Sequence, residues 1–258
     1  MSNNRALITG ASSGIGREFA VQLASRGFGI TAVARREDKL RELIDQLPGD
    51  QHDYLTADLS SETGVNSVIA AIELSRYQLL VNNAGFSAFE PFYHSELTLQ
   101  KNILNVNCGA VVSLAHAFLE KSQDGDALIN VASITAYLPT PAQPMYSASK
   151  AFIASLSECL WIEHKDRGVY VMGLCPGLTE SEFIQTASGG KSDGQSLAAL
   201  TQATPTMVGE ALRALEKRKK SIIITGRINR LMGLMPRFMT RHRLIKVLAV
   251  IGDPDKAL

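Results

Sequence analysis

The chain has 258 residues, of which 45% are hydrophobic and 20% are charged, and its formal net charge is +1. This length and hydrophobic content are enough for one large core and fit a single α/β domain. The near-zero charge gives no general attraction to nucleic acid, so no nucleic-acid partner is expected. Three widely spaced cysteines indicate neither a disulfide framework nor a metal site, which favours a reducing, cytoplasmic compartment.

The first predicted elements are a strand, a glycine-rich turn and a helix. The apolar run 6–9 predicts the strand, and the helical pattern begins at Arg17. Between them lies Gly10-Ala11-Ser12-Ser13-Gly14-Ile15-Gly16, whose glycines let backbone N–H groups approach a pyrophosphate at the helix N-terminus. The alternative is an ordinary strand-to-helix turn. Because only four residues precede the first strand, no leader is expected, and no unbroken run of 18 apolar residues suggests a transmembrane helix.

The second predicted strand, 29–34, ends on Arg35 and Arg36. A free ribose 2′-hydroxyl is usually held by an acid at this place, and a 2′-phosphate by arginine. No acid precedes the pair, and the arginine fork of donors matches phosphate. The pattern therefore predicts NADP(H) over NAD(H), with two solvated arginines as the alternative.

Two further predicted strands, 52–57 and 79–81, also end on polar or small residues. Asp58, followed by Leu59, lies where a carboxylate could accept a hydrogen bond from an adenine amino group, although capping of the next helix is equally consistent. The second strand ends on Asn82-Asn83-Ala84-Gly85, which suits close backbone packing near a cofactor. An ordinary turn is the alternative, since Asn and Gly favour turns.

The long helical pattern 97–119 contains Asn102, Asn105 and Asn107. Asparagine is a poor residue for a helix interior because its side chain competes for backbone hydrogen bonds. Three asparagines within six positions indicate that at least one of them has a specific role.

A predicted strand at 127–132 ends at Ser133, and a helix is expected to begin near Tyr146. Tyr146 and Lys150 are four residues apart, so their side chains share one helix face. A phenol titrates near ~10, and a nearby positive charge lowers that value, which makes tyrosine a usable general acid or base. Because ligands bind at the strand ends of open parallel sheets, Ser133 and Tyr146 are expected to meet beside a nicotinamide. The alternative for the Tyr-Lys pair is a surface helix pair.

From Thr9 to about Ile224 the chain resembles the short-chain dehydrogenase/reductase family. The motifs occur in the family's order and spacing, namely Thr9-Gly10-x3-Gly14-x-Gly16, Asn82-Asn83-Ala84-Gly85, Asn107, Ser133, Tyr146-x3-Lys150 and Pro176-Gly177. The resemblance implies a single α/β domain of Rossmann type, with a doubly wound parallel β-sheet and helices on both faces.

The resemblance also implies roles for the residues of the motifs. Tyr146 would give or take the proton, and Lys150 would lower its pKa and hold the nicotinamide ribose. Ser133 would orient the carbonyl, and Asn107 would anchor a water in the proton relay. The expected contacts to NADP(H) are Gly10, Ser12, Ser13, Gly14, Ile15, Gly16, Arg35, Arg36, Asp58, Leu59, Asn83, Ala84, Gly85, Tyr146, Lys150, Pro176, Gly177 and Thr179.

The remaining elements complete a catalytic domain over residues 1–226. The apolar stripe of the helix at 151–163 indicates core packing, and the resemblance adds packing across an interface in a homodimer or homotetramer. Strands are predicted at 169–174 and 221–225, with a helix at 211–220 between them. The irregular stretch at about 180–204 occupies the place of the family's substrate lid, and its flanking apolar residues suggest an apolar substrate.

Residues 227–258 form a basic, apolar C-terminal extension. From Lys217 to Gly252 there are ten Lys or Arg and no Asp or Glu. Such a segment could lie on an anionic membrane surface, roof the substrate pocket, or pack on its own or a neighbouring subunit. Pro236 is expected to divide it into two short helices at most.

The sequence thus predicts an NADPH-dependent reductase of a ketone or aldehyde, reversible as an alcohol oxidation, with a hydrophobic small-molecule substrate. Hydride transfer would be the chemistry of the cofactor. One alternative is an NADP-linked alcohol or steroid dehydrogenase. Another, from a different class, is a nucleotide-sensing regulator on the same fold. The intact set Asn107, Ser133, Tyr146 and Lys150 argues against a regulator, which needs no proton relay.

Overall fold

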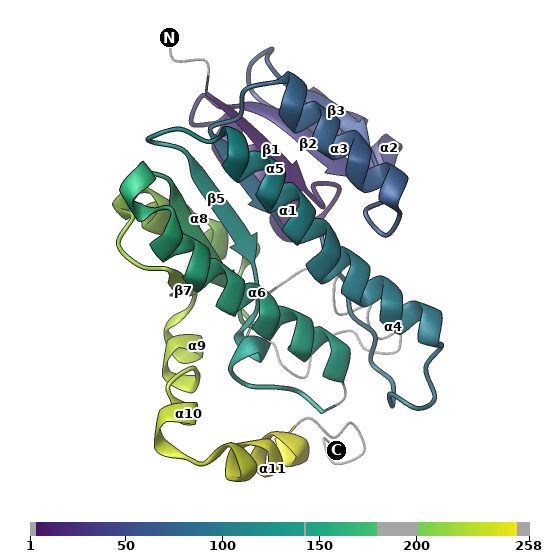
Figure 1. Ribbon diagram of the computed structural model, residues 1–258, viewed down its shortest axis with the longest axis vertical. Coiled ribbons are helices and arrows are strands. Elements are labelled where there is room, and N and C mark those ends of the chain that lie inside the picture. The colour runs from purple at the N-terminus through teal and green to yellow at the C-terminus, as the bar shows by residue number, and fades with distance from the viewer. Residues whose placement is uncertain (1–3, 142, 180–200, 252–258) are drawn as a thin grey trace.

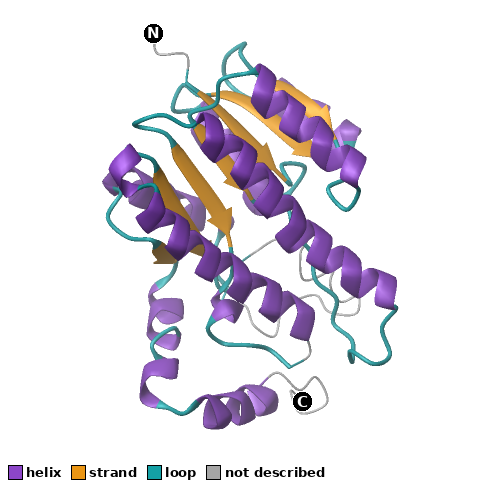
Figure 2. Ribbon diagram, viewed as in Figure 1, coloured by secondary structure: helices purple, strands orange, loops and turns teal. Residues whose placement is uncertain are grey.

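Seven short apolar segments form one central sheet in the computed structural model, which describes residues 4–141, 143–179 and 201–251 (Figures 1 and 2). The strand order is β3-β2-β1-β4-β5-β6-β7, and every neighbouring pair is parallel. The strands are β1 Arg5–Thr9, β2 Gly29–Ala34, β3 Asp53–Thr56, β4 Leu79–Asn82, β5 Ala127–Val131, β6 Tyr170–Cys175 and β7 Ile222–Ile224. All seven lie within one residue of the predicted bounds at either end, so the predicted parallel sheet is confirmed.

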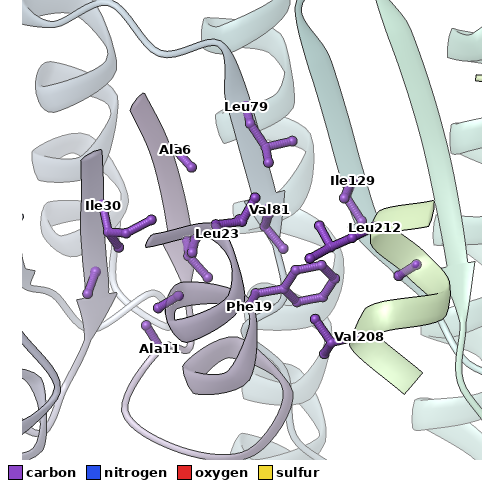
Figure 3. Packing of buried hydrophobic residues seen from close by; sticks show 14 of the residues in the cluster. Ala6, Ala11, Phe19, Leu23, Ile30, Leu79, Val81, Ile129, Val208 and Leu212 are labelled. Atoms are coloured by element: carbon purple, nitrogen blue, oxygen red, sulfur yellow. The ribbon is translucent and has the colours of Figure 1, made fainter. Parts of the chain in front are cut away.

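The inner strands are buried almost throughout because helices cover both faces of the sheet. The main helices are α1 Gly14–Ala24, α2 Glu37–Gln46, α3 Glu62–Leu74, α4 Leu97–Leu104, α5 Val111–Lys121, α6 Pro144–Glu163 and α8 Thr204–Lys217. On one face, Phe19 of α1 and Leu212 of α8 pack over the sheet near Val81 and Ile129 (Figure 3). On the other face α3 and α5 supply the core residues. The predicted two-sided packing is confirmed.

The chain order places a crevice in the middle of the sheet. β1 pairs with β2 on one side and with β4 on the other, so the connections leave β1 in opposite directions. In open α/β sheets ligands bind at such a switch point, outside the carboxyl ends of the strands.

The asparagine-containing helix is interrupted by a π-helical segment, η1 Asn105–Ala110, between α4 and α5. The whole run Leu97–Lys121 is long and apolar enough to cross a membrane by length and composition, although polar residues interrupt it and no transmembrane helix was predicted. However, 61% of its most apolar window is buried inside the protein. It therefore serves as a core helix, and π-bulges of this kind are frequent at functional sites.

The C-terminal segment leaves the end of β7 as an arm of three helices, α9 Arg227–Met232, α10 Met235–Phe238 and α11 Arg241–Ile251 (Figure 1). The prediction that Pro236 separates two helices is wrong. Pro236 lies in the first turn of α10, where its missing N–H costs no helical hydrogen bond. Most of the lid predicted at about 180–204 lies outside the described residues.

Candidate active site

A cleft of about 500 Å³ opens at the carboxyl ends of the strands. Nearly all the residues predicted from the sequence line it, namely Gly10, Ser12, Ser13, Gly14, Ile15, Arg35, Arg36, Asp58, Leu59, Asn83, Ala84, Gly85, Ser133, Tyr146, Lys150, Pro176, Gly177 and Thr179. Gly16 and Asn107 do not line it. The structure therefore brings together residues from the six segments that follow β1 to β6.

Gly16 and Asn83 fix the position of the glycine-rich turn that borders the cleft. A Cβ atom on Gly16 would lie 2.4 Å from the Gly10 carbonyl oxygen, so only glycine lets α1 approach the turn after β1 this closely. The Asn83 amide donates to the Thr9 carbonyl at 2.9 Å, and the Thr9 hydroxyl accepts from the N–H groups of Asn83 and Ala84, both at 3.0 Å. These bonds tie the ends of β1 and β4 and leave the N-terminus of α1 facing the cleft, where an anion is stabilised.

Arg35 and Arg36 stand at the rim of the cleft beyond β2, and both are exposed. Arg36 donates to the Ser12 hydroxyl at 3.2 Å, which holds the guanidinium over the glycine-rich turn. Arg35 lies close enough to Asp58 to favour its charged form. A phosphate on the ribose 2′-oxygen would thus meet two positive charges at this end of the cleft.

Asp58 does not cap the following helix. Ser61 is the N-cap of α3, and its hydroxyl accepts from the Gly64 N–H at 3.1 Å. Asp58 instead accepts from the N–H and the hydroxyl of Ser60, at 3.0 and 2.8 Å, and these hydrogen bonds lower the pKa of its carboxyl. Of the two interpretations left open by the sequence, the capping one is wrong, and a carboxylate lining the cleft remains.

Ser133, Tyr146 and Lys150 meet at the other end of the cleft. Ser133 follows β5, and its hydroxyl accepts from the Thr135 N–H at 3.2 Å and is hydrogen-bonded to the Tyr146 hydroxyl. The Lys150 ammonium lies 5.6 Å from the centroid of the Tyr146 ring and donates to the Val131 carbonyl at 2.8 Å. The first turns of α6 therefore place the phenol and the amine against the end of β5.

The pKa values of this pair are shifted by burial. Burial raises the pKa of Tyr146 to about 12, although its hydrogen bond with Ser133 works in the opposite direction. Burial likewise lowers the pKa of Lys150 to about 8. The net shift of the Tyr146 pKa is therefore upward, because withdrawal from water dominates it. The lowering by Lys150 that the resemblance implies stays a prediction.

Asn107 lies behind the cleft and is fully buried. Its side-chain oxygen accepts from the Phe86 N–H, and its amide donates to the Phe86 carbonyl and to the Ser149 hydroxyl, all at 3.1 Å. Ser149 in turn donates to the Tyr146 carbonyl at 2.8 Å. Asn107 therefore joins the loop after β4 to the start of α6 and fixes the backbone that carries Tyr146.

Several residues of the cleft were not predicted from the sequence. The Ser87 hydroxyl donates to the Gln143 side-chain oxygen at 2.8 Å, and both residues are buried and line the cleft together with Phe86 and Phe89. Asn102, one of the three asparagines singled out in the sequence, lines it as well. A signal for Gln143 existed, since it lies three residues before Tyr146 at the start of the same helix. Ser87 and Phe89 stand in an irregular loop with no periodicity, so the sequence contained no comparable signal for them.

The buried Lys150 should make the protein less stable than a variant without the charge. Lys150 is 4% exposed, and its pKa falls from 10.5 in the unfolded chain to about 8 in the folded protein. Below pH 8 both states carry the proton, so the folded state bears a penalty on the order of 3 kcal/mol. Between pH 8 and 10.5 only the unfolded state keeps the proton, and stability contributed by this group rises with pH.

We therefore expect Lys150→Met to melt no lower than the wild type at pH 7. We also expect the melting temperature of the wild type to rise relative to that of the variant as the pH increases from 7 to 10. Melting temperatures of both proteins over this range measure the difference, and other titrating groups cancel in it. A difference that stays constant with pH would contradict the depressed pKa of Lys150.

Among the described residues no group of three His, Cys, Asp or Glu could hold a metal ion. The cleft instead fits a dinucleotide, with a helix N-terminus and two arginines towards one end and Tyr146 and Lys150 at the other. Gly85 adds to this fit, because a Cβ atom there would lie 3.3 Å from the Lys150 ammonium and narrow the cleft beside it.

Comparison with known proteins agrees with this arrangement. The family profile described as short chain dehydrogenase matches residues 4–191. Sulfoacetaldehyde reductase 2 of Chromohalobacter salexigens is 32% identical over 191 residues, which cover 71% of this chain and 76% of that protein. The very-long-chain 3-oxoacyl-CoA reductase of Mus musculus is 28% identical over 250 residues, 91% of this chain and 76% of that protein.

Two solved structures are similar over almost the whole chain. A short-chain dehydrogenase from Sphingobium yanoikuyae in complex with NADPH is 26% identical with a TM-score of 0.79, over 92% of this chain and 96% of that one. A 7β-hydroxysteroid dehydrogenase is 25% identical with a TM-score of 0.85, over 95% and 96%. The chain therefore belongs to the short-chain dehydrogenase/reductase family, oxidoreductases that act on alcohol and carbonyl substrates with a nicotinamide cofactor.

Proposed function

We propose that the protein is an NADPH-dependent reductase of ketones or aldehydes that also runs as an alcohol dehydrogenase. The observation that carries the proposal is the Tyr146 hydroxyl, hydrogen-bonded to Ser133 inside a dinucleotide-sized cleft, with the Lys150 ammonium over the Tyr146 ring. A nucleotide-sensing regulator would have no use for this hydroxyl pair.

The roles follow from the positions of the hydroxyls. Ser133 and Tyr146 are two donors that can hold one carbonyl oxygen, and charge that develops on this oxygen is stabilised by donors already in place. Bound NADPH supplies the hydride. Tyr146, protonated at neutral pH because burial raises its pKa, gives its proton to the oxygen. Lys150 stays in place through the Val131 carbonyl and keeps positive charge beside the phenol below its pKa of about 8.

The preference for NADP(H) is supported by Arg35 and Arg36 at the rim of the cleft, with no acid at the end of β2. The bond from Arg36 to Ser12 pre-orients one guanidinium towards the place of the ribose. The solved relative from Sphingobium yanoikuyae, which holds NADPH, is consistent with this preference.

The proposed substrate is hydrophobic. Phe86, Phe89 and Ile134 line the cleft together with Tyr146 and Lys150. Phe89 is 41% exposed, so a bound apolar ligand could bury it. The relative that acts on very-long-chain 3-oxoacyl-CoA supports a long apolar substrate. An NADP-linked steroid dehydrogenase is the second candidate, supported by the similarity to the 7β-hydroxysteroid dehydrogenase.

The assembly and compartment are also part of the proposal. Exposed apolar side chains on the outer sides of α4, α5 and α6, namely Leu97, Leu104, Val112 and Phe152, support a homodimer or homotetramer through these helices. All three cysteines are free, and Cys159 is exposed, which supports a reducing cytoplasmic location.

A series of ketones and aldehydes of rising chain length tests the proposed function. With NADPH oxidation as the readout, we expect kcat/KM to rise by about fourfold for each methylene group until the pocket is filled. A sulfonate-bearing aldehyde of similar size to the shortest member serves as the polar comparison. A flat or falling profile would contradict the hydrophobic substrate, and no turnover of any carbonyl would contradict the reductase.

Two phenylalanines of one loop provide a matched pair of variants for the same series. Phe89 lines the cleft, whereas Phe92 is 53% exposed and does not line it. We expect Phe89→Ala to flatten the dependence of kcat/KM on chain length and Phe92→Ala to leave it unchanged.

A further inference from the structure

The C-terminal arm carries a row of apolar side chains that point into solvent. Ile228, Leu231, Leu234 and Phe238 follow one another at steps of three, three and four residues, so they share one face of α9 and α10. Their exposed fractions are 51%, 71%, 39% and 84%. The backbone between the two helices stays helical at Gly233 and Leu234, which keeps the row continuous. We call these four side chains the outer stripe.

The opposite side of the arm is anchored to the protein. Asn229 is buried, its amide donates to the Thr225 carbonyl at 2.9 Å, and it lies so close to Gly177 that no Cβ atom would fit there. Arg230 forms an ion pair with Glu210 and donates to the Ile224 carbonyl at 3.0 Å. Asn229 and Arg230 thus fix the inner side of α9 next to the loop after β6, with Ile228 and Leu231 of the outer stripe left exposed on the same helix.

The arm is also the basic part of the molecule. From Arg227 to Gly252 the arm has six Lys or Arg and no Asp or Glu, and four more basic residues, 217–220, lie before β7. The rest of the chain has 16 basic and 25 acidic residues, a net charge of −9. Arg227, Arg237 and Arg241 are exposed on the same two helices or directly after them. Among the described residues of the arm, Arg230 is the one basic side chain that forms an ion pair.

We propose that the outer stripe docks on the surface of an anionic lipid bilayer. Apolar side chains in a row with arginines beside them are the pattern of a helix that lies in a membrane interface, where the stripe enters the lipid and the guanidinium groups reach the headgroups. A symmetric contact with a second copy is less favourable, because it would bring the arginines of one arm against those of the other.

Co-sedimentation of the full chain with vesicles tests the proposal. We expect binding to phosphatidylcholine vesicles that contain phosphatidylglycerol, weak binding to phosphatidylcholine alone, and release as the salt concentration rises. Equal binding to both kinds of vesicle, or none to either, would overturn the proposal.

Matched variants distinguish docking through the outer stripe from nonspecific binding to vesicles. Leu231→Ser should weaken the partition coefficient by about tenfold, and Arg237→Gln with Arg241→Gln by about fivefold for each charge removed. The controls are Leu74→Ser, at a leucine that is 87% exposed on α3, and Lys101→Gln with Lys165→Gln, which remove two exposed charges elsewhere. The controls should bind as the wild type does.

The molecular mass in solution tests whether a second copy of the chain, and not a membrane, covers the outer stripe. If Leu231→Ser or Phe238→Ser lowers the mass measured by light scattering and leaves vesicle binding unchanged, the outer stripe is an interface between copies, and the membrane proposal is wrong. All the substituted side chains are exposed, so the melting temperature should stay within a few degrees of the wild type and confirms that each variant is folded.

Discussion

Replacing Tyr146 with phenylalanine should reduce kcat for carbonyl reduction by about 10²- to 10⁴-fold. The substitution removes the hydroxyl that is hydrogen-bonded to Ser133 and leaves a ring of nearly the same shape beside Lys150. Among the described residues that line the cleft, Tyr146 is the one phenol, so no other is in place to replace the proton donor. Binding of NADPH, measured by fluorescence titration, should change by less than a few fold, because the ring and the lysine remain in place.

Tyr137 provides the matched control for this variant. It follows the 3₁₀ turn after Ser133, burial raises the pKa of its phenol well above the usual value, and it does not line the cleft. Tyr137→Phe therefore removes a hydroxyl whose pKa burial also raises, from the same region, and should keep most of the wild-type rate. Equal losses in both variants would mean that the site depends on packing and not on the Tyr146 hydroxyl.

The raised pKa of Tyr146 also gives the two directions of the reaction different pH profiles. Reduction needs the protonated phenol, which is present throughout the neutral range because burial raises the pKa to about 12. Oxidation of the alcohol needs the phenolate, whose fraction grows by about tenfold per pH unit below that pKa. The oxidation rate should therefore climb with pH while the reduction rate stays flat near neutrality.

The parts of the fold that the sequence predicts well are those with a strong local cause. The strands are short, mostly apolar runs, four of which end at or just before Gly10, Asp58, Asn82 or Ser133. Parallel order follows because helices lie between the strands. The cleft was equally predictable, since the carboxyl ends of parallel strands meet at one edge. Thr9, Asp58, Asn82 and Ser133 each end or follow a strand, which places their neighbours together without any knowledge of packing.

The features that could not be predicted from the sequence depend on packing between segments that are distant along the chain. Asn107 was singled out as unusual in a helix, but its bonds to Phe86 and Ser149 exist only once the loop after β4 meets α6. The pKa of Tyr146 was expected to fall because Lys150 is four residues away, and the depth of burial that reverses the direction is a property of the whole fold. The arm was misjudged at Pro236 because proline both ends helices and begins them.

Cofactor preference should change when the two arginines after β2 are replaced. In the double variant Arg35→Gln with Arg36→Gln, we expect kcat/KM for NADPH to fall by about 10²-fold, since each charge-assisted hydrogen bond to a phosphate contributes about 1.5–3 kcal/mol. The value for NADH should change by less than a few fold, because a ribose with a free 2′-hydroxyl offers no phosphate to these side chains. Steady-state kinetics with both cofactors and one carbonyl substrate measure the ratio.

Arg41→Gln is the control for this change of cofactor preference. Arg41 is an exposed arginine of α2 that bonds to Glu37 and Tyr54 and does not line the cleft, so its loss removes the same charge outside the site. If general attraction between positive charge and a polyanionic cofactor were the cause, Arg41→Gln would also weaken NADPH, and raising the salt concentration would erase the difference between the variants. If Arg35 and Arg36 recognise the 2′-phosphate directly, the control variant keeps the wild-type ratio of kcat/KM for NADPH to kcat/KM for NADH. Equal losses for the two cofactors in the double variant would show that the pair is only solvated and would leave the cofactor preference to other residues of the cleft.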